Sequence, residues 1–547
     1  MRHAALLTVI GLAVYANALH APFVFDDLHA VVENPFVRQL WPLTQAAAAP
    51  PQSALSGRPV VSLSMAVNYG VGGLAPAGYH AWNLTVHVAA ALLLFAIVRR
   101  HLEDRFAFIA AALWLVHPLQ TEVVDYTTQR TESMMGLFFL ATLYTSTRGW
   151  NVAAVLSCTL GMATKESMVT APVIVLLYDA TFESQSIARA VRRRPWFYAG
   201  LAACWLVLLT LNVSGPRSHT AGFSTRVTPL QYALSQAPML ATYFKLVVWP
   251  HPLILDYGPV PPNTFMQVWQ AVAALLILAT VVTIVLRRER RLAFLGIWFV
   301  VTLAPASSFV PVATEVGAER RMYLPLAAVG VLAAVAVRKL DGQARRLTLP
   351  IAAAVLAVLA AVSMQRNAEF SAPIALWEHV IEHRPHARAR HSLGLALQQA
   401  GRRDEAIAQY RAAEAQYPLA HYNLGRQLSS AGRHDEAISE LRAWLQTEPG
   451  DADGRGVLAD LLLRERRYAE AVVEYTNYLR LTPANAAAHN NRGLALVHEN
   501  RVAEAVREFR TALALAPSAS GASQNLARAL SIMANQPSNG SDMSFLR

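Results

Sequence analysis

The chain has 547 residues, of which 54% are hydrophobic and 15% charged, with a mean hydropathy of +0.30. Soluble proteins carry about a quarter charged residues, so this composition excludes an ordinary soluble protein. The net charge of +11 does not indicate nucleic-acid binding, because the cations lie mostly in short loops between apolar runs. Both cysteines, Cys158 and Cys204, lie inside apolar runs, which excludes a disulfide framework.

The apolar runs are confined to one part of the chain. Residues 1–365 hold nearly all of them, whereas 377–520 read like a soluble helical domain. We therefore predict an all-α protein with a polytopic membrane bundle over 1–365 and a tetratricopeptide-repeat solenoid over 366–520. The polar tail, 521–547, is expected to begin as a capping helix and then become disordered.

The membrane part is predicted to cross about eleven times. A spanning helix needs about 20 mostly apolar residues. The candidates are 4–20, 80–98, 106–118, 133–146, 151–164, 167–180, 196–213, 266–286, 292–306, 322–337 and 347–364. The first of these ends in Ala-Asn-Ala, which also fits a cleaved signal peptide. We prefer a retained helix, because a loop with chemically interesting residues follows it at once.

Arginine clusters orient these spans. They comprise Arg99, Arg100 and Arg105; Arg192, Arg193 and Arg194; Arg287, Arg288, Arg290 and Arg291; and Arg338, Lys339, Arg345 and Arg346. All lie on one side if 229–250, which contains two prolines, does not cross and if 151–180 crosses twice, with a break at Ala163–Ser167. The positive-inside rule makes that side cytoplasmic. The loop 21–79 and the repeats are then extracytoplasmic, and the arginine- and alanine-rich composition favours a bacterial inner membrane.

Prolines recur near the end of each repeat, at Pro385, Pro418, Pro449, Pro483 and Pro517. Between them a small residue is followed twelve positions later by alanine, as in Gly394/Ala406, Gly425/Ala437, Ala459/Ala471 and Gly493/Ala505. This period of about 34 is typical of tetratricopeptide repeats, which bind proteins and carry no chemistry. We expect Tyr410, Tyr422 and Tyr475 to be core residues and Trp377 to mark a docking half-repeat.

Two acidic groups lie at the predicted outer face. Asp26 and Asp27 follow the first span, and such a pair can act as a general base or hold a divalent cation. A capping or turn pair is the alternative. Glu122, Arg130 and Glu132 lie in HPLQTEVVDYTTQRTES, for which the alternative is a solvated loop with internal ion pairs.

Two cationic groups lie at the same face. Lys165, beside Glu166 at the predicted hairpin tip, suits a phosphate, although it could equally form a salt bridge or snorkel. Arg320 follows Glu319 and precedes Tyr323, and an arginine here can clamp a phosphate, with an interface anchor as the alternative. Carboxylates and phosphate-binding cations on one face are what transfer from a lipid phosphosugar requires.

These residues carry a resemblance to a known family. The strings GRPVVSLSMAVNY around Arg58, GYHAWNLTVHVAAALLLF containing His80, HPLQTE, RTES, TKES, WPHPLILDY and AERRMYLP occur in an order that resembles the transmembrane and tetratricopeptide-repeat-containing proteins. These are C-type glycosyltransferases related to the protein O-mannosyltransferases. The resemblance extends from residue 4 to about 520.

The resemblance implies a polyprenyl-phosphate-linked sugar as donor, a protein as acceptor and a catalytic acid in the first external loop. It leaves open whether Asp26 or Asp27 is the base. Lys165, Arg320 and Arg58 would bind the donor phosphate. The substrate cleft would contain Glu122, Arg130, Glu132, Glu166, Glu319, Tyr323 and His80, and the repeats would recruit the acceptor.

Two other interpretations remain. A non-enzymatic scaffold would use the membrane part only as an anchor, but an anchor needs one span. A transporter would place ionisable residues near the bilayer midplane, whereas these lie at the outer face. Convergence of Asp26, Lys165 and Arg320 would favour the enzyme, and scatter would favour the scaffold.

Overall fold

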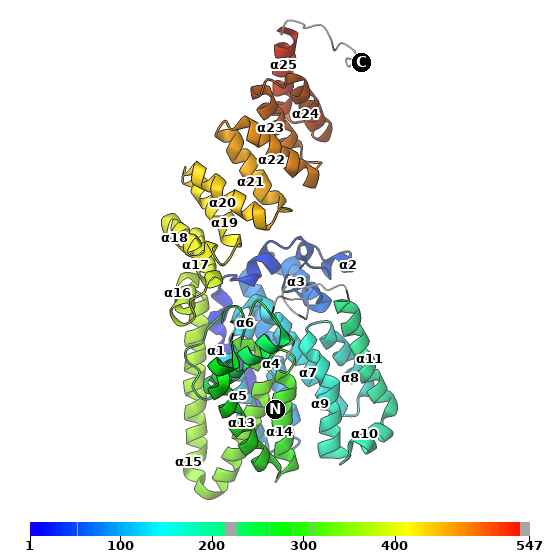
Figure 1. Ribbon diagram of the computed structural model, residues 1–547. Coiled ribbons are helices and arrows are strands. Elements are labelled where there is room, and N and C mark those ends of the chain that lie inside the picture. The colour runs from blue at the N-terminus through cyan, green and yellow to red at the C-terminus, as the bar shows by residue number, and fades with distance from the viewer. Residues whose placement is uncertain are drawn as a thin grey trace. The chain divides into compact units, whose positions relative to one another are not determined.

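The computed structural model describes residues 1–51, 53–213, 222, 227–261, 263–287, 289–307 and 310–535. Within these ranges every extended regular element is a helix, which confirms the all-α prediction (Figure 1). The chain divides into two compact units, Met1–Pro385 and His386–Arg547. The predicted domain boundary, after residue 365, therefore lies inside the first unit.

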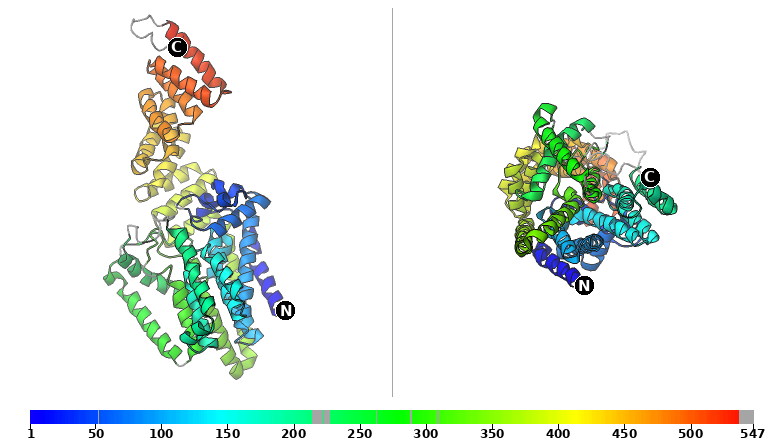
Figure 2. Two further views of the ribbon diagram at one scale, coloured as in Figure 1. Left: turned by 90° about the vertical axis from the view of Figure 1, so that its right-hand side faces the viewer. Right: turned by 90° about the horizontal axis from the view of Figure 1, so that it is seen from below.

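The first unit is a bundle of apolar helices that run side by side (Figures 1 and 2). Its longer helices are α1 (Arg2–Val14), α3 (Pro59–Gly72), α4 (Pro76–Val98), α5 (Asp104–Val116), α7 (Arg130–Thr147), α8 (Asn151–Met162), α9 (Ala171–Tyr178), α11 (Pro195–Asn212), α12 (Pro229–Val248), α13 (Phe265–Arg287), α14 (Arg290–Leu303), α15 (Pro325–Phe370) and α16 (Pro373–His383). Each predicted span coincides with one of these helices or with part of one.

Four segments of the described chain are helical, long and apolar enough to cross a membrane by themselves: Pro76–Val98, Pro195–Asn212, Phe265–Ile284 and Leu347–Phe370. A fifth results if α5 and the bent segment after it are counted together. The remaining spans rest on shorter helices, so the count of eleven stays a prediction.

The segment 151–180 reverses direction at Lys165, as predicted. Lys165 pairs with Glu132 at the start of α7, whereas Arg194 donates to Ser146 O (3.3 Å) near the end of that helix. Arg194 also lies 3.7 Å from Asp179, just beyond α9. Helices α8 and α9 therefore run in opposite directions, and Lys165 and Glu166 lie at the tip between them.

Helix α15 packs along α5 twice. A tryptophan near the end of α5 donates to Tyr323 O, just before α15 begins (2.7 Å). Asp341 pairs with Arg105 at the start of α5 (3.1 Å), and Ser363 Oγ donates to Val116 O at its end (2.7 Å). The two predicted spans in 322–364 are therefore antiparallel arms, and Figure 1 shows the turn between them.

The arginine-rich ends of the helices gather at one end of the bundle. Arg100 pairs with Glu183 (3.3 Å), and Arg105 pairs with Asp341. Of the predicted clusters, Arg288 and the side chains of Arg287, Arg345 and Arg346 lie outside the described residues. The other arginines of these clusters that form ion pairs do so at this end of the bundle, opposite Lys165. This agrees with the prediction that the clusters lie on a common side.

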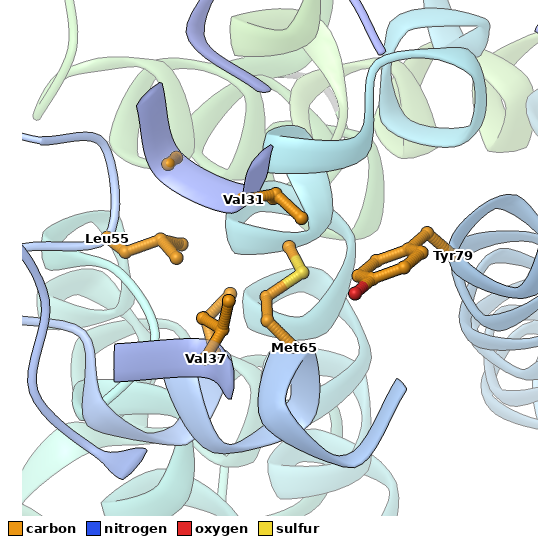
Figure 3. Packing of buried hydrophobic residues seen from close by; sticks show 7 residues of the cluster. Val31, Val37, Leu55, Met65 and Tyr79 are labelled. Atoms are coloured by element: carbon orange, nitrogen blue, oxygen red, sulfur yellow. The ribbon is translucent and has the colours of Figure 1, made fainter. Parts of the chain in front are cut away.

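The long loop between α1 and α4 has a hydrophobic core of its own (Figure 3). Val31, Val37, Leu55, Met65 and Tyr79 are almost completely buried there and point toward one another. A core of this kind fixes a loop that would otherwise be mobile. It therefore gives Asp26, Asp27 and Arg58 a rigid support.

The second unit is a series of antiparallel helix pairs. Its helices are α17 (Ala387–Gln399), α18 (Arg403–Glu414), α19 (Leu419–Ser430), α20 (His434–Thr447), α21 (Ala452–Arg464), α22 (Tyr468–Leu481), α23 (Ala486–His498), α24 (Val502–Leu515) and α25 (Ser520–Asn535). Tyr410 and Tyr475 are buried as predicted, but Tyr422 is only half-buried and lies beside Trp444, which is also half-buried (6.1 Å between ring centroids). Of the predicted tail, 521–535 is helical and 536–547 lies outside the described residues.

Glycines mark where paired repeat helices touch. A Cβ atom added at Gly493 would lie 2.6 Å from the ring of Phe509, and one at Gly394 would lie 2.6 Å from the ring of Tyr410. These contacts explain the small residues of the repeat pattern.

Replacing one of these glycines is expected to destabilise the repeat unit. Gly493→Ala forces the Phe509 ring to shift, and overpacking of this kind costs about 1–3 kcal/mol. Thermal unfolding of the purified protein measures the loss. Gly521→Ala is the matched control, because a Cβ there meets nothing within 4 Å. Equal destabilisation by both variants would contradict the packing argument.

Candidate active site

The two neighbouring aspartates have different environments. Asp27 is completely buried, and its carboxylate accepts hydrogen bonds from Thr128 N (2.7 Å), Thr128 Oγ1 (2.5 Å), Thr127 N (3.2 Å) and Val24 N (3.3 Å). Burial raises the Asp27 pKa to about 7, against the lowering effect of these bonds. Asp27 therefore ties the first loop to residues 127–128.

Asp26 is only partly buried, and its backbone N–H donates to the Tyr126 hydroxyl at 3.2 Å. The preceding residue, Phe25, has a φ of +53°, a conformation that is rare for a bulky side chain. Its ring packs edge-on against Trp377 of α16, with 5.2 Å between the centroids. Such local strain is often found at functional sites.

Arg58 and Lys165 come from separate segments that are bonded together. Arg58 precedes α3, and Val60 N donates to Ala163 O (3.3 Å) across to the tip after α8. Arg58 Nη2 pairs with Glu166 Oε2 at 3.0 Å, and Lys165 Nζ pairs with Glu132. Each cation is therefore fixed by a carboxylate from the predicted set.

Arg320 lies in a short 3-10 helix, Glu319–Met322, and is held between two carboxylates. Its guanidinium donates to Glu122 Oε2 (3.2 Å) and to both oxygens of Glu315 (2.8 and 2.6 Å). Glu319 itself is completely buried and accepts from Ile254 N and from the Tyr257 hydroxyl. Burial raises its pKa to about 8.

The three cations affect one another and Asp26. Burial lowers the Arg58 pKa to about 10, Glu132 and Asp26 oppose that shift, and Arg320 adds to it. Burial likewise lowers the Lys165 pKa to about 8, Glu132 opposes the shift, and Arg58 and Arg320 add to it. Asp26, Arg58, Lys165 and Arg320 thus lie within one electrostatic neighbourhood.

Three residues predicted for the cleft have internal partners. Arg130 is completely buried and donates to Asn83 Oδ1 (2.7 Å), Ser64 O (3.1 Å) and Tyr79 O (3.0 Å). The ring nitrogens of His80 face two backbone carbonyls, at 2.9 and 3.0 Å. The Tyr323 hydroxyl is bonded to His87 Nδ1 (3.0 Å) inside an aromatic cluster. All three residues therefore have partners inside the protein, and their contact with substrate stays a prediction.

Sequence reasoning missed three contributors. Glu315 and Tyr126 contact Arg320 and Asp26 as described above. Arg366, near the end of α15, is 2% exposed and contributes a positive charge close to Glu122 and Glu319. Glu315 and Arg366 lie outside the quoted strings, and Tyr126 lies inside HPLQTEVVDYTTQRTES but was not singled out. For Arg366 the sequence offered a signal, because an arginine inside an otherwise apolar span usually faces the interior of a bundle.

Within the described ranges, two groups of histidine and glutamate have ligand atoms that all lie within 4.8 Å of one another. They are His379, Glu382 and His383, and Glu414, His421 and Glu440. Neither group contains a candidate site residue, so the divalent cation considered for the aspartate pair stays untested.

Comparison with known proteins gives the following similarities. A tetratricopeptide-repeat family model matches residues 391–452 and 457–520. A protein O-mannosyl-transferase of Caenorhabditis elegans is 27% identical over 438 residues, which cover 74% of this chain and 61% of the relative. The protein O-mannosyl-transferase TMTC3 of Mus musculus is 32% identical over 154 residues, covering 26% of this chain and 17% of its own. A solved structure titled "MamA MSR-1 C2" covers 27% of this chain and 87% of its own, at 22% identity and a TM-score of 0.25, a likeness that carries no argument about function.

The fold and the comparisons define the class, a protein of apolar membrane-type helices followed by tetratricopeptide repeats. Within that class the chain is similar to the transmembrane and tetratricopeptide-repeat-containing protein O-mannosyl-transferases, as the motif strings indicated. It spans less than two thirds of the length of these curated relatives.

Proposed function

We propose that this protein is an integral-membrane glycosyltransferase. It would move mannose or a similar sugar from a polyprenyl-phosphate donor to a protein hydroxyl at the extracytoplasmic face. The observation that carries this proposal is the convergence of Asp26, Arg58, Lys165 and Arg320 from three distant segments. The printed names of the curated relatives, all protein O-mannosyl-transferases, support it.

In this mechanism Asp26 is the general base that removes the proton from the acceptor hydroxyl. Its partial exposure leaves it accessible, whereas Asp27 is completely buried among four hydrogen bonds. Deprotonation of the hydroxyl lets its oxygen attack the anomeric carbon of the sugar, while the bond from that carbon to the phosphate oxygen breaks. The leaving group is the polyprenyl phosphate, which gains one negative charge.

The cations stabilise that developing charge. Arg320 keeps its positive charge, because Glu315 and Glu122 raise its pKa against the effect of burial. Arg58 and Lys165 lie in the same neighbourhood, and preorganised cations act strongly where charge develops. Glu122, Glu132 and Glu166 hold the three cations in place.

An apolar cavity can take the lipid chain. It has a volume of about 490 Å³ and extends between α5 and both arms of α15, from His117 to Leu340 and Leu347. His117 directly follows α5 and is only a few residues from Glu122. A chain that begins at the cation cluster would therefore enter this cavity at its nearer end.

The test is sugar transfer by the purified full chain in detergent. The donor is polyprenyl-phosphate mannose with a radiolabelled sugar, and the acceptors are extracytoplasmic proteins from a lysate. Transfer of label to protein supports the proposal. The scaffold would be favoured if a folded protein transferred none of the lipid-linked sugars tested while its repeats still captured a partner.

The value of kcat/KM for the donor should change with pH. Lys165 is charged below its pKa of about 8 and neutral above it, so its attraction for the donor phosphate is present at lower pH and lost as the pH rises. We expect kcat/KM for the donor to fall about tenfold from about pH 7 to about pH 10, the effect of one charged hydrogen bond. Lys165→Arg should flatten this fall, since arginine stays protonated. An unchanged profile in that variant would contradict the role of Lys165.

A further inference from the structure

Helix α16 carries a histidine pair at metal-ligand spacing that the proposed reaction does not use. Its sequence ends in HVIEH, with His379 and His383 four residues apart, and residues at this spacing share one face of a helix. The two ring centroids are 4.3 Å apart. One ligand atom each of His379, Glu382 and His383 lies within 4.8 Å of the others.

The position of His383 on the helix also suits a cation. His383 is the last residue of α16, and cations are stabilised at a helix C-terminus. Its Nδ1 lies 3.0 Å from the carbonyl oxygen of His379.

The second histidine–glutamate group has a structural explanation. His421 pairs with Glu440 at 2.6 Å between the paired helices of its repeat. The same positions one and two repeats later hold Arg455–Glu474 (2.9 Å) and His489–Glu508 (2.8 Å). Because arginine, which binds no metal, occupies this position in one repeat, the pair is an ion pair of the repeat architecture. In helix α16, His383 Nδ1 lies 3.0 Å from His379 O and 4.0 Å from Glu382, so its partners are within the helix itself and it is not an ion pair between repeat helices.

We propose that His379, His383 and Glu382 bind one divalent first-row metal ion of the zinc type. Two imidazole nitrogens and one carboxylate oxygen are common zinc donors, and a water would complete a tetrahedral site. All three ligands lie in the last two turns of α16. The bound ion therefore holds these turns together and stabilises the helix. Trp377 of the same helix packs against Phe25, which precedes Asp26, so the ion also supports the segment that carries the proposed base.

The experiment is titration of the untagged full chain with zinc chloride after removal of metals by a chelator. Isothermal calorimetry should give one ion per chain near pH 7, and affinity should fall at least tenfold near pH 5, because protons compete with the metal for histidine ligands. Cobalt chloride should give the visible absorption of a low-coordinate site. No uptake by the wild-type protein would overturn the proposal.

The variants distinguish this site from other histidines. His379→Gln combined with His383→Gln should abolish the stoichiometric uptake, and the thermal stabilisation by zinc should disappear with it. His421→Gln is the matched control and should retain one ion per chain. Uptake that survives in the double variant and is lost in His421→Gln would assign the ion to the repeat pair and overturn the proposal.

Discussion

Replacing Asp26 by asparagine is expected to lower kcat for sugar transfer by about 10²–10⁴-fold, the usual contribution of a general base. The asparagine keeps the size of the side chain and cannot accept a proton. Because Asp26 is only partly buried and asparagine keeps an oxygen that can accept from the Tyr126 hydroxyl, the fold should persist. Single-turnover transfer with labelled donor, together with the thermal unfolding midpoint, separates the two effects.

Asp27→Asn is the matched control. We expect it to lower the stability of the fold rather than kcat. The amide offers one acceptor oxygen where the carboxylate accepts four hydrogen bonds, so at least one buried donor near Thr127 or Thr128 loses its partner. This costs about 1–3 kcal/mol of stability, while the folded fraction should still transfer sugar. If Asp27→Asn were stable and inactive while Asp26→Asn remained active, the assignment of the base would be reversed.

The sequence could not separate the two aspartates, because the difference lies a hundred residues away. Asp27 is buried by Thr127 and Thr128, which belong to the segment after α5. Along the sequence, the two carboxylates have the same neighbouring residues. Only tertiary contacts decide which one is desolvated and bonded and which one stays accessible.

The helices were predictable because their causes are local. Apolar runs of sufficient length indicated the helices of the first unit, and the 34-residue period identified the repeats. The break at Ala163–Ser167 was predicted because it brings the arginine clusters to one side. Tyr422 was misjudged, because the repeat pattern places it in a helix but does not determine how much of its ring, which lies beside Trp444, is covered.

The same limit applies to Arg130. Its position between Glu122 and Glu132 in a charged string suggested an ion pair or a substrate contact. The structure instead gives its guanidinium three neutral acceptors from α3 and α4, segments that come more than 40 residues earlier in the chain. A charged residue near a site is thus assigned to chemistry or to scaffold only when its partners are known.

Arg130→Lys is therefore expected to destabilise the first unit rather than to change donor affinity. Lysine cannot reproduce the planar fork that reaches Asn83, Ser64 and Tyr79 together. Leaving one or two of these buried acceptors without a donor costs about 2–4 kcal/mol, and the thermal midpoint in detergent should fall by roughly 2–5 °C for a unit of this length. Arg148→Lys, at an exposed arginine beyond α7, should leave the midpoint unchanged. A stable Arg130→Lys protein with a raised KM for the donor would return Arg130 to the substrate site.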